Sequence, residues 1–275
     1  MLFALATFYI RWDRAALGVV GCSILRTERQ LPPLLTAPFR WWFDFWVHTS
    51  DVETLFNAIQ LPVSPRSKLR ELGEASALIC GGVDLRARNN NGDTPLLSLL
   101  KQPHYREPDA RLMVVAMLKA GVDVNEIDRD GNTALHLAVE EGPPKIVRKL
   151  LKYGADPQRA NTSGDTALHL AVRKAVPNGD GFYRNHLQKI ALLASAPGGR
   201  EAIALRDREG RPTLHLVSLI PRSENALQVL KLLLKSKPDL MSTDLEGNTA
   251  EQFAIIRQKS RIAEALAQHR SQTAR

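Results

Sequence analysis

One short motif recurs along the chain, and it constrains the fold more than any other feature of the sequence. A turn with a glycine is followed at once by Thr-Ala-Leu-His or a close variant. The five copies have their glycines at Gly92, Gly131, Gly164, Gly210 and Gly247, so the spacings are 39, 33, 46 and 37 residues. A repeat of this length indicates an array of stacked units, each of which buries its apolar face against its neighbours.

The residue types of the motif suit such units on physical grounds. Glycine at the turn admits a backbone conformation that is strained for other residues. A threonine that begins a helix can accept a hydrogen bond from a backbone N–H group that has no partner within the helix. Leu135 and Ala138 are three residues apart and share a helix face, which we expect to face the neighbouring unit.

The pattern resembles that of the ankyrin repeat family, which has a period of about 33 residues and a Thr-Pro-Leu-His core. Residues 128–160 have this length and read Asp-x-x-Gly-x-Thr-Ala-Leu-His-Leu-Ala. The resemblance covers about residues 67–269 and implies an all-α solenoid of stacked helix-turn-helix units with hairpin-like tips. It also implies that His136, His169 and His215 form structural hydrogen bonds and do not bind a metal.

The repeats divide the chain into an N-terminal segment, an array and a tail. We assign residues 1–50 to an irregular aromatic-rich segment, 51–88 to a degenerate first repeat with helices over 51–59 and 67–79, and 270–275 to the tail. Five repeats lie between, over residues 89–127, 128–160, 161–206, 207–243 and 244–269. In the last repeat Glu251 and Gln252 replace Leu and His, which suits a C-terminal cap with no neighbour beyond it. The extra residues of two longer repeats, 103–109 and 177–184, are expected to form loops.

The first sixty residues differ in composition from the rest, because they hold eleven of the sixteen Phe, Trp and Tyr residues and all four Trp. Their two apolar runs, over residues 1–10 and 15–25, are both shorter than the roughly 20 residues that span a bilayer. Three interpretations stay open for this segment: a cap on the first repeat, a partner interface, or an element that lies on a membrane surface.

Charge and motif content exclude several classes of protein. The net charge of +8 and the pI near 9.7 reflect a modest basic excess, and the repeats lack the aromatic platforms of single-strand binders, so we expect no specific nucleic acid. Two cysteines cannot form a disulfide framework. The turn after Asp128 lacks the Gly and Glu of a calcium loop. We expect no enzyme activity, cofactor or metal, and a cytoplasmic location, with the nucleus and a membrane surface as alternatives.

The resemblance places partner-binding positions beside the turn glycine and just after the Thr-Ala-Leu-His core, along a concave groove. In the first full repeat they are Arg88, Asn90, Asp93, Lys101 and Gln102, and in the following repeats we expect Arg129, Asn132, Glu140, Glu141, Asp165, Arg173, Lys174, Arg206, Arg208 and Arg211. The sign of the charge changes from acidic at Glu140 and Glu141 to basic from Arg173 to Arg211.

The basic stretch predicts a protein partner with an acidic segment, because the planar guanidinium group of arginine binds carboxylates with two hydrogen bonds. A solvated surface that only aids solubility is the other interpretation of these cations. The predicted function is a protein-interaction scaffold or adaptor. The alternative is a membrane-associated regulatory protein that residues 1–46 anchor.

Overall fold

The computed structural model describes residues 52–60, 79, 83–102, 108–175 and 180–273, and in these ranges every regular element is a helix. Antiparallel contacts between single residues occur in the connections, but they do not extend into strands. The chain divides into two compact units, Met1–Asp123 and Val124–Arg275. The predicted all-α class is confirmed, whereas residues 1–50 and nearly all of the helix expected over 67–79 lie outside the described residues.

Unit 1, residues 1–123, has three described helices: α4 (Val52–Gln60), α6 (Pro95–Lys101) and α7 (Pro108–Lys119). α4 lies where the sequence predicted the first helix of a degenerate repeat, and its Leu55 and Ile59 are buried. It packs against α6, which in turn contacts α7. α6 begins with Pro95 directly after Thr94, an order that suits a helix start because proline lacks the N–H that would have no partner there.

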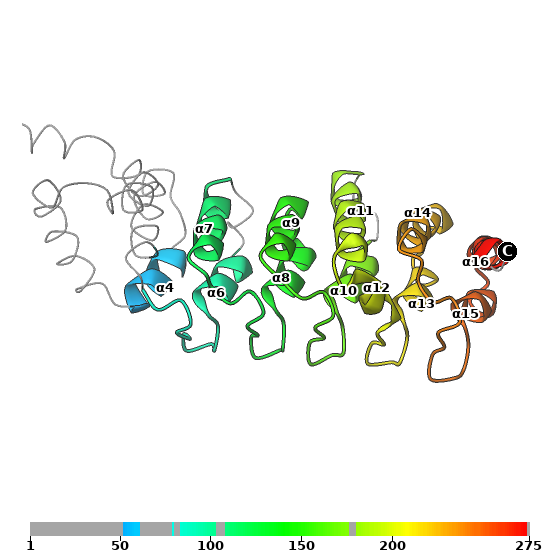
Figure 1. Ribbon diagram of the computed structural model, residues 1–275, viewed down its shortest axis with the longest axis horizontal. Helices are drawn as coiled ribbons and strands as arrows, with labels where there is room; N and C mark the ends of the chain where they lie inside the picture. The colour runs from blue at the N-terminus through cyan, green and yellow to red at the C-terminus, as the bar shows by residue number, and fades with distance from the viewer. Residues whose placement is uncertain (1–51, 61–78, 80–82, 103–107, 176–179, 274–275) are drawn as a thin grey trace, which may run out of the picture. The chain divides into compact units, whose positions relative to one another are not determined.

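Unit 2, residues 124–275, has nine described helices, and eight of them form two layers (Figure 1). The inner layer contains α8 (Ala134–Glu141), α10 (Ala167–Arg173), α13 (Thr213–Val217) and α15 (Ala250–Ile256), each in contact with the next. The outer layer contains α9 (Pro144–Lys152), α11 (Asp180–Ser195), α14 (Ser223–Leu234) and α16 (Ser260–Thr273), in the same relation. The short α12 (Gly199–Ala204) contacts α11 and α13. Small and aliphatic side chains such as Ala171 and Val172 are fully buried in this stack.

Four turns precede the inner helices and project from the same side of unit 2 (Figure 1). We name them turn A (128–132), turn B (161–165), turn C (207–211) and turn D (244–248). The first residue of each is Asp or Asn, and its side-chain oxygen accepts hydrogen bonds of 2.8–3.0 Å from the backbone N–H groups two and four residues later. Such bonds fix the turn without any partner from outside.

The glycines of turns A and B, Gly131 and Gly164, are needed for two separate reasons. Both have φ +73°, in the left-handed region that a Cβ atom disfavours. In addition, a Cβ atom at Gly131 would lie 2.9 Å from the backbone nitrogen of Thr162, and one at Gly164 would lie 2.8 Å from that of Arg208. Turns A, B and C therefore stack backbone against backbone.

The expected loop over residues 177–184 is only partly correct, because α11 begins at Asp180. The glycines of this stretch favour a turn, but packing of α11 against α9, α10 and α14 overrides that local preference. The helix carries Lys189, which is 2% exposed, and its Nζ donates a hydrogen bond of 2.6 Å to the carbonyl oxygen of Val139 near the end of α8. The last carbonyls of a helix lack partners within the helix and carry partial negative charge, so a cation is favourable there.

Candidate functional site

The inner helices are tied to the next turn by a recurring histidine. In α8 the Nδ1 atom of His136 accepts a hydrogen bond of 3.1 Å from the backbone N–H of Thr133, so Nε2 carries the proton. Nε2 donates it to the carbonyl oxygen of Asp165 in turn B, 2.9 Å away. His169 repeats the arrangement with Thr166 and, one repeat further on, with the carbonyl oxygen of Leu205. The structural hydrogen bonds that the resemblance implied for these histidines are confirmed.

These histidines stay neutral near neutral pH because they are buried. Burial lowers the pKa of His136 and His215, and it lowers the pKa of His169 to about 4. A neutral ring keeps Nδ1 as an acceptor and Nε2 as a donor, which both hydrogen bonds require. The histidines therefore hold the turns in place.

The fourth copy of the motif departs from this pattern, because Pro212 stands where the others have threonine. His215 still donates from Nε2 to the carbonyl oxygen of Asn248, at 2.9 Å. Proline has no N–H to donate, however, and Nδ1 of His215 is buried without a hydrogen bond, as is the hydroxyl of the neighbouring Thr213. The start of α13 is thus less well satisfied than the starts of α8 and α10.

The ten groove residues predicted in unit 2 lie in the turns, directly before turn C, and at or just after the ends of the inner helices, but they differ in accessibility. Arg129, Glu141, Arg173, Lys174, Arg206 and Arg208 are exposed, Asn132, Glu140 and Arg211 are half-buried, and Asp165 is buried. The turn-side face is our name for the surface formed by turns A to D, by Arg206 directly before turn C, and by the C-terminal ends of the inner helices with the one or two residues that follow them.

Arg173 and Arg211, the two ends of the predicted basic stretch, converge on one buried carboxylate. Arg173 contacts Asp165 of its own repeat and Asp207 of turn C, with Nη2–Oδ2 at 2.7 Å for the second pair. Arg211 binds the same Oδ2 atom through Nε at 3.1 Å and Nη2 at 3.0 Å. Arg211 also pairs with Glu209. Both guanidinium groups are therefore compensated within the chain.

The pKa values of the two aspartates of this cluster shift in opposite directions. Burial alone would raise the pKa of Asp207, but hydrogen bonds from Arg211 and Arg173 together with the charge of Arg211 bring it below its usual value. The pKa of Asp165 is raised, because burial and the nearby Asp207 outweigh Arg173. The cluster thus stabilises the contact between turn B and turn C.

Lys174 is compensated as well, by an ion pair of 3.0 Å with Glu140 between the ends of α10 and α8. Of the five cations in the predicted basic stretch, this leaves Arg206 and Arg208 without an ion pair among the described residues. Sequence reasoning missed Asp207 as a partner, although its place as the first residue of turn C was the available signal. It also missed three exposed apolar residues of the turn-side face, Leu219, Leu245 and Ile256.

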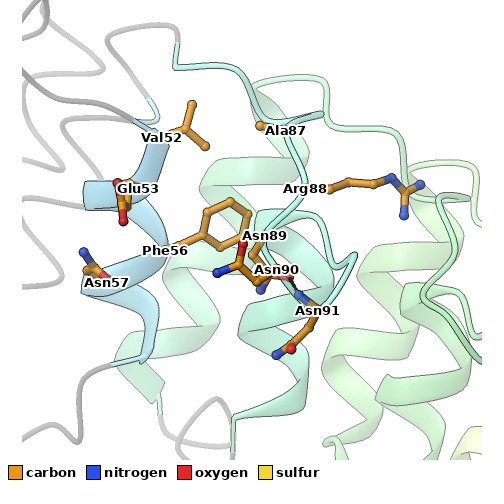
Figure 2. A pocket seen from close by; sticks show the side chains of 9 residues that line it. All are labelled: Val52, Glu53, Phe56, Asn57, Ala87, Arg88, Asn89, Asn90 and Asn91. Carbon is orange, nitrogen blue, oxygen red and sulfur yellow. Dashed lines mark hydrogen bonds between the residues drawn. The ribbon is translucent and has the colours of Figure 1, made fainter.

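In unit 1 the corresponding positions are polar. Lys101 pairs with Asp93 at 2.7 Å, and Nη1 of Arg88 donates to the carbonyl oxygen of Gly92 at 2.7 Å. An open depression of about 610 Å³ lies between α4 and the turn over residues 87–91, and Asn90 contributes to its rim (Figure 2). Its walls are mostly amide and charged groups, unlike an apolar ligand pocket.

Metal and membrane features can be described only for part of the chain. In the ranges that the structure describes, no group of three or more His, Cys, Asp or Glu side chains could hold a metal ion. No described helix is long and apolar enough to cross a bilayer. The membrane anchor considered for residues 1–46, like the aromatic cluster there, lies outside the described residues.

The two helix layers and the turn-side face of unit 2 define a helical repeat protein that presents a row of turns to solvent. Comparison with known proteins indicates the same class of protein. The family model described as ankyrin repeats in three copies matches residues 70–161 and 111–198. The chain therefore contains ankyrin repeats over the matched residues, and such repeats generally mediate protein–protein interactions and are typically not enzymes.

Two curated relatives are both named nuclear factor NF-kappa-B p105 subunit. The one from Gallus gallus is 34% identical over 161 residues, which are 56% of this chain, and the one from Mus musculus is 31% identical over 153 residues, or 54% of this chain. The chain spans only 14% of the length of each relative.

Solved structures show the same fold. The ankyrin repeat protein EF0377 superposes with a TM-score of 0.62 at 21% identity, covering 80% of this chain and 98% of its own. An ankyrin repeat domain from Acinetobacter baumannii gives a TM-score of 0.61 at 21% identity, with coverages of 79% and 97%. At this identity the likeness concerns the fold alone.

Proposed function

We propose that the chain is a non-catalytic scaffold or adaptor that holds a protein partner on the turn-side face of unit 2. One observation carries the proposal. Turns A to D are held rigid by their own hydrogen bonds, and each presents the side chain of its second residue to solvent: Arg129, Thr162, Arg208 and Leu245. Rigid turns that vary in their exposed residue suit recognition, because little conformational entropy is lost on binding.

An acidic segment of the partner is the ligand that the charges favour. Arg206 and Arg208 are exposed and have no ion pair among the described residues, so their guanidinium groups are available to carboxylates. Arg173, Lys174 and Arg211 already have acidic partners in the chain and contribute less. Within the predicted stretch from Arg173 to Arg211, the proposed docking site for an acidic segment is therefore limited to Arg206 and Arg208.

The test is affinity capture from the native cell with the full chain, followed by mass spectrometry. The variant is Arg206→Glu with Arg208→Glu, which spares the cluster around Asp207. The matched control is Lys145→Glu with Arg148→Glu, two exposed cations of the outer helix α9, so that the net charge changes equally. We expect specific partners to be lost from the first variant only. Equal capture by all three proteins would refute the assignment of this face.

A further inference from the structure

The turn-side face is not chemically uniform, and the difference lies along the ends of the inner helices. The residue eight positions after the last residue of each turn is Glu140 in α8, Arg173 in α10, Leu219 just after α13 and Ile256 in α15. The first two are charged and have ion-pair partners. The last two are aliphatic, and they are 37% and 60% exposed.

These four residues share one sequence register relative to the turns, and Arg173 shows where a side chain in this register reaches. Arg173 contacts Asp165, the last residue of the preceding turn, and Asp207, the first residue of the next. A side chain at this position therefore lies along the turns, on the turn-side face. Leu219, in the same register after turn C, places an apolar side chain where the neighbouring repeat has a charged one.

The turn tips add a third apolar residue beside this row. Leu245, the second residue of turn D, is 72% exposed, and its side chain lies over turn C, since a Cβ atom at Gly210 would be 2.1 Å from its Cγ. The equivalent residue of turn C is Arg208, and Arg206 approaches turn D through a contact of 3.4 Å between Nη2 and the hydroxyl of Thr243. Apolar and cationic side chains thus adjoin over turns C and D.

We infer that the segment bound by this chain is amphipathic as well as acidic: it places carboxylates on Arg206 and Arg208 and at least one large apolar side chain on Leu219, Leu245 and Ile256. The inference rests on the proposed function and deepens it. A protein segment can alternate acidic and apolar residues to match both groups. A nucleic acid carries a negative charge at every phosphate, so its backbone would also meet the carboxylates of Glu209 and Glu246 at the same turns.

The experiment uses the full chain and a phage-displayed library of random dodecapeptides as the probe. Enriched peptides are synthesised with a fluorescent label, and their dissociation constants are measured by anisotropy. We expect enriched sequences to combine Asp or Glu with Leu, Ile, Phe or Trp. Enrichment of basic peptides, or of acidic peptides without large apolar residues, would overturn the inference.

Two sets of variants separate the inference from the function on which it rests. Leu245→Ser and Ile256→Ser remove apolar surface, and Arg206→Glu with Arg208→Glu removes the cations. We expect each of the three to weaken binding about tenfold or more: the serine variants because burial of one large apolar side chain is worth roughly that factor, and the arginine reversals because glutamates would repel the carboxylates of the ligand. Leu112→Ser on α7, where the leucine is 59% exposed, is the matched control and should leave binding unchanged.

The outcomes distinguish the amphipathic ligand from the acidic docking site. If the arginine reversals weaken binding and the serine variants do not, the amphipathic ligand is refuted and the acidic docking site stands. If neither set matters, or if no enriched peptide binds the full chain, both are refuted. Circular dichroism melts of each variant verify that binding is lost without loss of the fold, which we expect because all four side chains are exposed.

Discussion

The start of α13 offers a direct test of how the repeat motif stabilises the array. Turn C leads into Pro212-Thr213-Leu214-His215, whereas turn A leads into Thr-Ala-Leu-His. The double substitution Pro212→Thr with Thr213→Ala would restore the pattern of α8. The new backbone N–H at position 212 could then donate to Nδ1 of His215, as Thr133 does to His136 at 3.1 Å.

The expected gain can be worked out from the unsatisfied atoms. A hydrogen bond to the buried Nδ1 of His215 contributes about 1 kcal/mol, and an N-cap hydroxyl contributes about the same. Removal of the unpaired hydroxyl of Thr213 relieves a desolvation cost of about 1–3 kcal/mol. Loss of proline lowers the free energy of unfolding by roughly 0.4–1 kcal/mol, because the unfolded chain becomes more flexible. We expect a net stabilisation of roughly 2–5 kcal/mol.

The assay is urea denaturation followed by circular dichroism, with amide hydrogen exchange to locate the effect. Because repeat arrays can unfold in parts, protection of the amides in α13 and α14 is the more specific readout. The converse substitution, Thr133→Pro with Ala134→Thr in α8, should cost a similar amount. If the first double variant is neutral or destabilising while its converse destabilises α8, the unsatisfied atoms of α13 are not the weak point that the geometry indicates.

Three further predictions concern the same contacts. Burial lowers the pKa of His169 in α10 and of His186 in α11 to about 4. In the unfolded chain each histidine has a pKa near 6.5, so below this pH the unfolded state binds more protons than the folded state. Each histidine should therefore lower the free energy of unfolding by about 2 kcal/mol when the pH falls from 7 to 5, which urea titrations at the two pH values would measure. Gly164→Ala should lower the free energy of unfolding by about 1 kcal/mol or more beyond the effect of Gly247→Ala. Both glycines have a positive φ, but only a Cβ atom at position 164 would meet backbone atoms of the next turn. Equal shifts in melting temperature would contradict the close stacking of the turns. Asp207→Asn should keep the turn, as Asn does at the start of turn B, but it removes the carboxylate that Arg173 and Arg211 share. Arg173 then keeps only Asp165 and Arg211 only Glu209, so we expect a cost of about 2 kcal/mol and a higher affinity for acidic peptides; a neutral result in thermal melts would argue against the cluster.

Features that depend on residues close in sequence could be predicted from the sequence. The Gly turns and the helix starts at Thr133 and Thr166, with the hydrogen bond from the threonine N–H to Nδ1 of the recurring histidine, follow from local hydrogen bonding that a short motif encodes. Even Gln252, expected only as part of a polar cap, continues the local pattern, because its Oε1 accepts the backbone N–H of Thr249 at 2.9 Å in place of a histidine ring. Glu251 pairs with Arg270 of α16 at 3.1 Å, which agrees with a capping role.

Features that join different repeats could not be predicted in this way. Net charge along the chain suggested free cations from Arg173 to Arg211, but whether a cation is free depends on which carboxylate the stacking brings beside it. Asp207 is 34 residues from Arg173 and reaches it only because turn C lies against the end of α10. The burial of Lys189 against the end of α8 and the helical start of α11 depend on the same stacking.

The amino-acid pattern alone therefore establishes the architecture, because the period indicates stacked units and the local motif supplies hydrogen-bond partners for the backbone groups of each turn and helix start. It also predicts that the binding positions lie on the turns and inner-helix ends. Which of those positions keep an available charge, and which present apolar surface, depends on the folded stack. The reason is physical: ion pairing and burial depend on distances between repeats, and these distances exist only once the helices have stacked.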